Sequence, residues 1–249
     1  MRELSRGGLL GSEDVAELVG VKESTVWRWC REGTLSCLKV GKQWRVRRGD
    51  LEDFFKQSER AATLVGRLDS FLRVPDNVLA IAENRDILHR LDAAFLQVGE
   101  ARGGLLAKFY GGEDISEDKL LARFEERGLD AGRLVDEGRL LMRSEEIPLG
   151  ERGDQLARFI EEEAGGGRAV WASFDWTMDV DLDTALEQQG RLAGLVDANQ
   201  LVVKTATLEE AIGGWSPSAL RRAQSLHSGT ILASKGGLWV ARATPLPAS

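Results

Sequence analysis

In the first 57 residues, apolar side chains recur at the spacing of short helices, with one segment between them that has the spacing of strands. The first predicted helix begins with Ser12 as its N-cap and ends at Gly20. The apolar stripe of the first helix consists of Val15, Ala16, Leu18 and Val19, and the second helix is expected to face the core with Val26, Trp29 and Cys30. A short turn at residues 21–24 joins the two helices, as in a helix-turn-helix.

The segment that follows, residues 36–46, predicts a β-hairpin of two short strands with its turn at Gly41 and Lys42. Four apolar side chains of this hairpin are expected to face the core: Leu38, Val40, Trp44 and Val46. A last helix is expected over residues 51–57. The order of two helices, a hairpin and a helix predicts a winged helix-turn-helix domain over residues 1–57.

The distribution of charge along the chain indicates what this domain could bind. The whole chain is acidic, with a formal net charge of -7, but its charge is uneven. Between Lys22 and Arg48 there are 8 Lys or Arg against 2 Asp or Glu, which is a local charge of +6. A basic patch in an acidic protein indicates a specific site for nucleic acid, rather than a protein that coats nucleic acid along its whole surface.

The predicted DNA contacts lie on the second helix and the hairpin. Thr25, Arg28 and Arg31 share the helix face opposite the core stripe, where Arg can read guanine and Thr can meet a thymine methyl or a phosphate. Phosphate contacts are assigned to Lys39, Lys42, Arg45 and Arg47, and the set is completed by Ser24, Trp27 and Gln43. The alternative to DNA contact is that the second helix is purely structural and its basic face is solvated. For Trp27, the alternative to a phosphate contact is a position in the core.

From residue 77 onward, short apolar runs alternate with amphipathic stretches. Strands are expected at residues 78–82, 105–109, 140–143, 169–174, 201–204, 230–233 and 238–242. Helices are expected at residues 85–98, 116–127, 149–164, 182–198 and 217–227. The alternation predicts a three-layer α/β domain over residues 77–249, with a mostly parallel sheet covered on both faces. Residues 58–76 are interpreted as a linker helix, with a dimer seam as the alternative.

This second domain shows no catalytic motif. The sequence contains neither the phosphate-loop pattern G-x-x-x-x-G-K-[ST], nor a dinucleotide-binding glycine pattern, nor a nucleophile elbow. Asp175 ends an apolar strand, where nucleotide hydrolases place a magnesium-binding acid. With Trp176 and Lys204 it forms the candidate ligand-binding set. Because the sequence shows none of these catalytic motifs, we expect a protein that is not an enzyme and that uses no metal and no cofactor.

The chain has two cysteines, Cys30 and Cys37, and two histidines. These numbers exclude a disulfide scaffold and argue against a zinc site built from Cys and His. Both cysteines are interpreted as small buried apolar side chains, with a thiol switch as the alternative.

Five segments of the N-terminal domain have sequences typical of a known group of DNA-binding domains. They are residues 12–16 (SEDVA), 25–29 (TVWRW), 33–35 (GTL), 39–46 (KVGKQWRV) and 50–54 (DLEDF). In these segments the domain resembles the excisionase and MerR-like group of winged helix-turn-helix domains. The resemblance implies that the second helix lies in the major groove, that the hairpin is a wing along the backbone, and that Trp27 lies near a phosphate. It also implies a bacterial protein.

The C-terminal domain resembles the MEDS sensory domain of regulators from methylotrophs and methanogens. The residues that carry this resemblance are 124–129 (FEERGL), 134–140 (LVDEGRL), 174–176 (FDW) and 220–227 (LRRAQSLH). It implies a RecA-like fold that has lost its phosphate loop and a role in sensing, and it names no ligand.

These features predict a sequence-specific transcription regulator of double-stranded DNA, acting as a homodimer or higher oligomer under the control of a small-molecule effector or a partner. One alternative is a DNA-architectural or excision factor whose second domain is an assembly platform. Another is a nucleotide-handling enzyme tethered to DNA. No apolar run approaches the roughly 20 residues that cross a bilayer, and no signal peptide is visible, so we expect a cytoplasmic protein, bound to the nucleoid, without a membrane partner.

Overall fold

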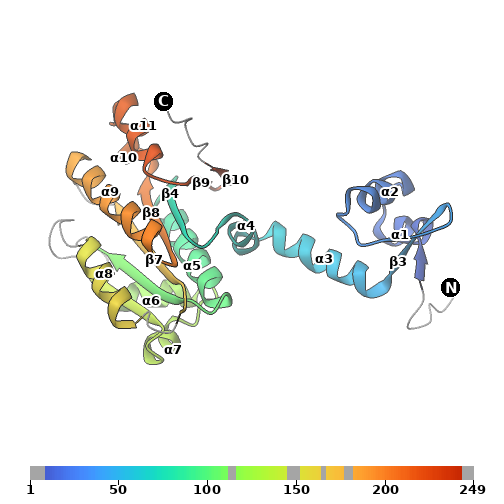
Figure 1. The fold of residues 1–249 in the computed structure, drawn as a ribbon, viewed down its shortest axis with the longest axis horizontal. Helices are drawn as coiled ribbons and strands as arrows, with labels where there is room; N and C mark the ends of the chain where they lie inside the picture. Colours follow the sequence, from blue (N-terminus) through green and yellow to red (C-terminus); the bar gives the residue numbers. More distant parts are fainter. Residues whose placement is uncertain (1–8, 112–115, 145–151, 164–166, 177–181, 243–249) are drawn as a thin grey trace. The chain divides into compact units, whose positions relative to one another are not determined.

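The structure is a computed structural model that describes residues 9–111, 116–144, 152–163, 167–176 and 182–242. The chain forms two compact units, Met1–Thr63 and Leu64–Ser249. The helices and strands of both units are labelled in chain order in Figure 1.

The N-terminal unit has the predicted helices and hairpin, and one further strand. Its elements are β1 (Leu9–Gly11), α1 (Ser12–Val19), α2 (Glu23–Glu32), β2 (Leu38–Val40), β3 (Gln43–Arg47) and α3 (Arg48–Ala62). The strand β3 lies between β1 and β2 in an antiparallel sheet. The buried core of this unit is small and consists of Leu10, Val15, Ala16, Val26, Cys30, Leu35, Val46 and Leu51.

Several helix boundaries in this unit differ from the sequence prediction, and α2 already begins at Glu23, inside the turn predicted at residues 21–24. The N-cap of α1 is Gly11 and not Ser12, and Asp14 accepts a hydrogen bond from the Gly11 N–H at 2.8 Å. The Ser12 hydroxyl is instead engaged with side chains of α2. The helix predicted at residues 51–57 is longer at both ends, since α3 extends from Arg48 to Ala62.

The register of the hairpin also corrects the predicted faces of the wing. Lys39 pairs with Trp44, and Leu38 pairs with Arg45, so the members of each pair share one face of the ribbon. Trp44 packs against the core as predicted, but Leu38 and Val40 lie on the opposite face and are 37% and 57% exposed. The reason is that the two-residue turn fixes the pairing, and each shift of one residue moves a side chain to the other face.

The C-terminal unit is a three-layer α/β domain built on a seven-stranded sheet, as predicted. Its strands are β4 (Asp76–Ala82), β5 (Leu105–Tyr110), β6 (Leu140–Ser144), β7 (Val170–Trp176), β8 (Leu201–Leu208), β9 (Gly229–Ser234) and β10 (Gly237–Arg242). Its helices are α4 (Leu64–Phe71), α5 (Arg85–Ala101), α6 (Glu117–Glu125), α7 (Ala131–Asp136), α8 (Arg152–Glu163), α9 (Leu182–Ala198), α10 (Glu209–Ile212) and α11 (Pro217–Ser225). The predicted start of α8 at residue 149 lies outside the described residues.

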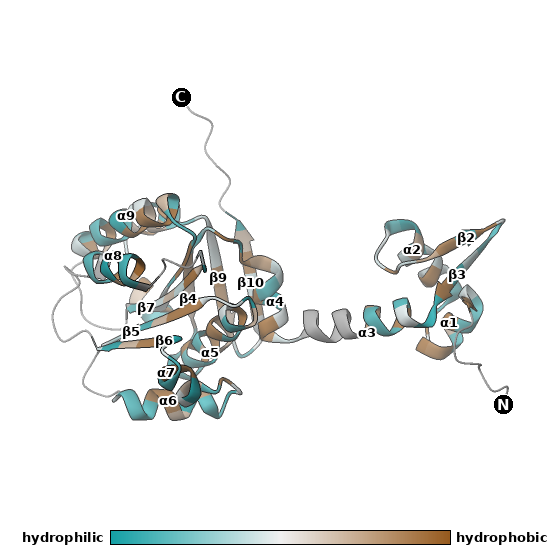
Figure 2. Cartoon of the chain, turned by 60° about the horizontal axis from the view of Figure 1, so that its bottom comes forward, coloured by the Kyte–Doolittle hydropathy of each residue, from teal (hydrophilic) through white to brown (hydrophobic). Residues whose placement is uncertain are grey.

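The strand order is β10-β9-β4-β8-β7-β5-β6, and the neighbouring strands are parallel except for β9 and β10. Alternation along each apolar strand buries both faces of the sheet. In β4, Val78 and Ala80 pack toward α5, whereas Leu79 and Ile81 pack toward α9 and α11. Figure 1 shows α5, α6 and α7 on one side of the sheet and α8, α9 and α11 on the other. Figure 2 shows apolar colouring along the central strands and polar colouring over much of α6 and α8.

Residues 58–76, interpreted from the sequence as one linker helix, are divided between α3 and α4. The helix α4 packs on its own unit, where Leu68 is fully buried. Leu64, Val65 and Phe71 are half-buried against the same cluster, which includes residues of α5. The apolar stripe of α4 is therefore used within the unit and is not offered as a dimer seam.

Candidate DNA interface and buried polar network

The free face of α2 carries the charged and aromatic side chains of the predicted DNA contact. Its exposed members fall at i, i+3, i+4 and i+7 along the helix: Ser24, Trp27, Arg28 and Arg31. Thr25, which the sequence places on the same face, is half-buried at its border. Neither Arg28 nor Arg31 forms an ion pair with a described residue, so both guanidinium forks are open to an external acceptor.

The position of Trp27 is fixed by a chain of hydrogen bonds between α1 and α2. Its indole N–H donates to the Ser12 hydroxyl at 3.0 Å, and that hydroxyl donates to the Glu23 carboxylate at 2.7 Å. The Trp27 side chain is 46% exposed, so the alternative of a core position is wrong. The hydrogen bonds hold the indole on the free face, beside Arg28.

The wing carries its polar contacts on two faces. Three of the predicted contacts alternate along β3 and share one face: Gln43, Arg45 and Arg47. The Arg45 guanidinium donates to the Gln43 side-chain oxygen at 2.6 Å. Lys39 lies on the other face, with its ammonium group 5.6 Å from the centre of the Trp44 ring. Lys42 is exposed in the turn at the tip. The structure therefore places the predicted phosphate contacts on one hairpin but not on one face.

The cysteines of this unit are joined, which the sequence did not predict. Cys30 and Cys37 form a disulfide, with their Cα atoms 5.3 Å apart. The interpretation of two separate buried thiols is wrong because the chain leaves α2 and turns back along it before β2 begins. Cys30 nevertheless contributes to the core, with 8% of its surface exposed. The bond connects the helix and the base of the wing, the two elements that carry the predicted DNA contacts.

Reduction of this disulfide should loosen α2 and the wing. Closing a loop with a sequence separation of 7 stabilises a fold by about 2–3 kcal/mol in the chain-entropy model, which is a large share of the stability of a small unit. We expect backbone amides of α2, β2 and β3 to exchange with deuterium faster in dithiothreitol, while amides of the large sheet serve as the internal control. The Cys30→Ala/Cys37→Ala variant should show the faster rate with or without reductant. Slow exchange in that variant would mean that the bond adds nothing.

A closed polar network lies inside the C-terminal unit, between the sheet and α5. Lys108 of β5 contacts the carboxylates of Asp92 at 2.9 Å and Asp175 at 2.6 Å. Lys204 of β8 contacts the second oxygen of Asp92. The Ser173 hydroxyl donates to Asp92 at 2.9 Å and accepts from Lys108 at 3.2 Å. Both lysines, Asp92 and Ser173 are completely buried, and Asp175 is 7% exposed. Two cations and two carboxylates therefore balance one another away from water.

Charge pairing outweighs burial at the centre of this network. Burial alone would raise the pKa of Asp92, but the ammonium groups of Lys108 and Lys204 hold that pKa well below its usual range. Burial alone would lower the pKa of Lys108, but the carboxylates of Asp175 and Asp92 raise it. At the rim, burial and the neighbouring Asp92 carboxylate raise the pKa of Asp175. Asp92 is therefore the fixed negative charge between two cations.

Two of the three residues predicted to bind a ligand belong to this network. Lys204 directs its ammonium group at Asp92, and Asp175 contacts Lys108, so both face the interior. The side chain of Trp176 lies outside the described residues. The sequence prediction missed Asp92 and Lys108. The available signal was the lysine inside the apolar strand LLAKFY, because a buried charge requires a partner.

These observations define the class of the molecule as a two-unit protein, a winged helix-turn-helix followed by a three-layer α/β unit. Residues 9–59 match the helix-turn-helix domain family, so the N-terminal unit is a helix-turn-helix DNA-binding domain. No curated protein matches the chain. Within the described residues, no helix is long and apolar enough to cross a membrane. The same residues contain no group of three or more His, Cys, Asp or Glu side chains that could hold a metal ion.

Proposed function

We propose that this protein is a sequence-specific transcription regulator that binds double-stranded DNA through α2 and the wing. The observation that carries the proposal is the exposed face of α2, with Trp27, Arg28 and Arg31 side by side and a basic hairpin in the same unit. In the major groove, the Arg28 and Arg31 forks match the two acceptors of guanine. The cations of the wing bind phosphates, which set the register of the helix on the duplex.

The protein acts as a homodimer or a higher oligomer. A single small DNA-binding module buries roughly 600–1,000 Å² of protein surface, which limits its affinity. Joining two modules raises the affinity through the effective concentration of the second one. Beyond residue 60 the chain has 21 Lys or Arg and 30 Asp or Glu, an excess charge of -9 that repels phosphates. DNA contact therefore stays with the N-terminal unit.

The C-terminal unit senses a signal and is not an enzyme. Its resemblance to MEDS domains supports a sensory role. Only Glu83 and Asn84 separate β4 from α5, and the Asn84 side chain caps the helix by accepting from the Ile87 N–H at 3.1 Å. A phosphate loop needs a longer glycine-rich connection at such a strand–helix junction. The network around Asp92 supports the same proposal, because its charges face one another inside the unit.

The proposed setting is the cytoplasm, where the regulator meets DNA. Cytoplasmic reductants keep most thiols reduced, so the Cys30–Cys37 pair would exist there mainly as two thiols.

The proposal is tested by selecting binding sites from random duplexes and measuring the affinity of the full chain by fluorescence anisotropy. Affinity that changes with a metabolite or nucleotide from a screened set supports the regulator. Unchanged affinity, together with bending of DNA that carries tandem sites, supports a DNA-architectural or excision factor. Nucleotide hydrolysis that is lost in Asp175→Ala would contradict the non-enzymatic proposal.

The wing contact has a separate test in the salt dependence of binding. Lys42→Ala should weaken binding to every duplex by a similar factor, because a phosphate contact carries no sequence information. The slope of log affinity against log salt should become shallower by about one. Lys235→Ala, which removes an exposed lysine from the β9–β10 turn of the other unit, is the matched control. An unchanged slope in Lys42→Ala would remove the wing tip from the interface.

A further inference from the structure

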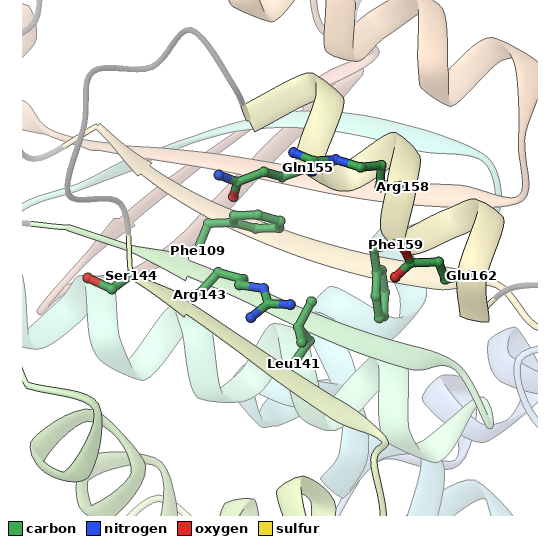
Figure 3. Close-up of a pocket in the computed structure, with 8 residues that line it drawn as sticks. All are labelled: Phe109, Leu141, Arg143, Ser144, Gln155, Arg158, Phe159 and Glu162. Atoms are coloured by element: carbon green, nitrogen blue, oxygen red, sulfur yellow. The ribbon is translucent and has the colours of Figure 1, made fainter.

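A cavity of about 340 Å³ opens between α8 and the edge strand β6. Apolar side chains line its inner part: Phe109 of β5, Leu141 of β6 and Phe159 of α8. Phe109 is completely buried and Phe159 is 8% exposed, so both rings are held by the core. Figure 3 shows Phe109 and Phe159 between the strands and α8.

Polar side chains surround this apolar interior. They are Arg143 and Ser144 at the end of β6, and Gln155, Arg158 and Glu162 on α8. The residues from α8, including Phe159, fall at i, i+3, i+4 and i+7, so a single helix face lines the cavity. In Figure 3 the Arg143 side chain extends from β6 toward Leu141 and Phe159.

Among the described residues, the arginines of the cavity have few partners. Arg143 forms no hydrogen bond or ion pair with a described residue, whereas Arg133, elsewhere on this unit, contacts three carboxylates. Among the described residues, Arg158 donates only to the backbone oxygen of Asp154, at 3.4 Å. Two arginines and Glu162 give the lining a charge of +1 in an acidic unit. A lining with this net positive charge favours an anionic ligand.

We propose that this cavity binds a small organic anion with a flat apolar body and one carboxylate. The planar guanidinium groups of Arg143 and Arg158 match a carboxylate, and the side chains of Leu141 and Phe159 accept an apolar body, with Phe109 packed behind them. The volume lies at the lower end of the range of about 300–1,000 Å³ for small-molecule sites. It is large enough for a ligand the size of benzoate.

The place of the cavity in the fold agrees with this assignment. Phe109, Arg143 and Ser144 belong to the last residues of β5 and β6, and open α/β sheets bind their ligands beyond the carboxyl ends of the strands. The inference deepens the proposed sensory role, on which it rests for its regulatory meaning, while ligand binding itself is independent of that role. It also places the effector site away from Asp175 and Lys204.

The chemistry of the site is tested with benzoate and the full chain, by ligand-observed NMR titration in the absence of DNA. Benzamide has the ring without the charge, and inorganic phosphate has the charge without the ring. We expect benzoate to bind at least tenfold more tightly than either compound. Failure of benzoate to bind would overturn the assignment, and so would equal binding of benzamide or phosphate.

Variants locate the binding within the molecule. Arg143→Gln and Arg158→Gln should each weaken benzoate binding about tenfold, and Glu162→Gln should strengthen it because a like charge is removed. Arg191→Gln on α9, whose exposed arginine contacts Glu187 at 3.3 Å, is the matched control and should bind as the unchanged chain does. Circular dichroism of each variant reports whether it is folded. Benzoate binding that none of the three cavity variants changes would contradict the site.

The failures of the two proposals are distinguishable. If benzoate does not bind but DNA affinity responds to another compound, the cavity assignment falls and the regulator stands. If benzoate binds at the cavity but the chain has no affinity for duplex DNA, the cavity stands and the regulator falls.

Discussion

Replacing Arg28 with alanine should lower the affinity for the specific DNA site by about 10- to 100-fold, because one bidentate contact to guanine is worth about 1–3 kcal/mol of discrimination. Affinity for duplexes of scrambled sequence should fall much less, since that binding depends on phosphates. Arg28 is exposed and has no ion-pair partner among the described residues, so its removal should leave the unit folded. Anisotropy titrations with a selected and a scrambled duplex at the same salt concentration measure the difference.

The Arg28→Lys variant separates base recognition from charge. Lysine retains the positive charge but lacks the planar fork, so it can replace a phosphate contact and replaces a bidentate base contact poorly. We expect binding to scrambled DNA to be retained and specific binding to stay close to that of the alanine variant. If alanine weakens both duplexes equally and lysine restores both, Arg28 contacts a phosphate and another side chain reads the bases.

The helices of the DNA-binding unit were predictable because the signal is local. Val26, Trp29 and Cys30 mark the inner side of α2 by their spacing, and the exposed face with Arg28 and Arg31 follows from the same period. The faces of the wing were not predictable in the same way. Apolar and polar residues alternate imperfectly in the hairpin, so the pairing of Lys39 with Trp44 decides which side chains point inward. Pairing depends on both strands together and cannot be read from the sequence of either strand alone.

In the large sheet, the positions of the strands were predictable, but several strand ends were not, and that of β8 differs most. β8 was expected to stop at Lys204, but it continues to Leu208. Thr205 remains inside because its hydroxyl donates to Gln189 of α9 at 3.0 Å, and Gln189 donates in turn to Asn77 at 3.1 Å. Such partners come from distant segments, which a pattern along one strand cannot show.

Lys108 inside an apolar strand indicated a buried charge, but its partners could not be predicted for the same reason. Asp92 lies in α5 and Lys108 in β5, and each looks like an isolated charge until the sheet brings β5, β7 and β8 under one helix. Asp175 was selected for its place at the end of an apolar strand, which indicated importance but not the kind of role. The contacts of Asp175 and Lys204 in the structure are with charges of the protein itself.

Removing the charge of Asp92 should destabilise the C-terminal unit by about 3–5 kcal/mol, because breaking a buried ion pair leaves an uncompensated buried charge. Asp92→Asn keeps the shape of the side chain but leaves Lys108 and Lys204 buried with one carboxylate, that of Asp175. The midpoint of thermal unfolding should fall by roughly 10 °C. Asp183→Asn is the control and should be nearly silent, since that side chain is 88% exposed and contacts Arg222 at 3.4 Å.

A second substitution shows whether this loss comes from charge or from shape. Lys204→Met removes the surplus cation from the Asp92→Asn variant and leaves the Lys108–Asp175 pair, 2.6 Å apart, as a balanced unit. We expect the double variant to be more stable toward urea than Asp92→Asn alone. With Lys204→Met as the second single variant, the double-mutant cycle should give a coupling energy of about 1–3 kcal/mol. Purely additive losses would mean that packing and hydrogen bonds around Ser173, and not charge balance, hold the network together. A positive coupling would explain why a lysine can lie in the middle of an apolar strand. The interior would then require that the buried charges of the network sum to zero, and no single charged side chain would be indispensable.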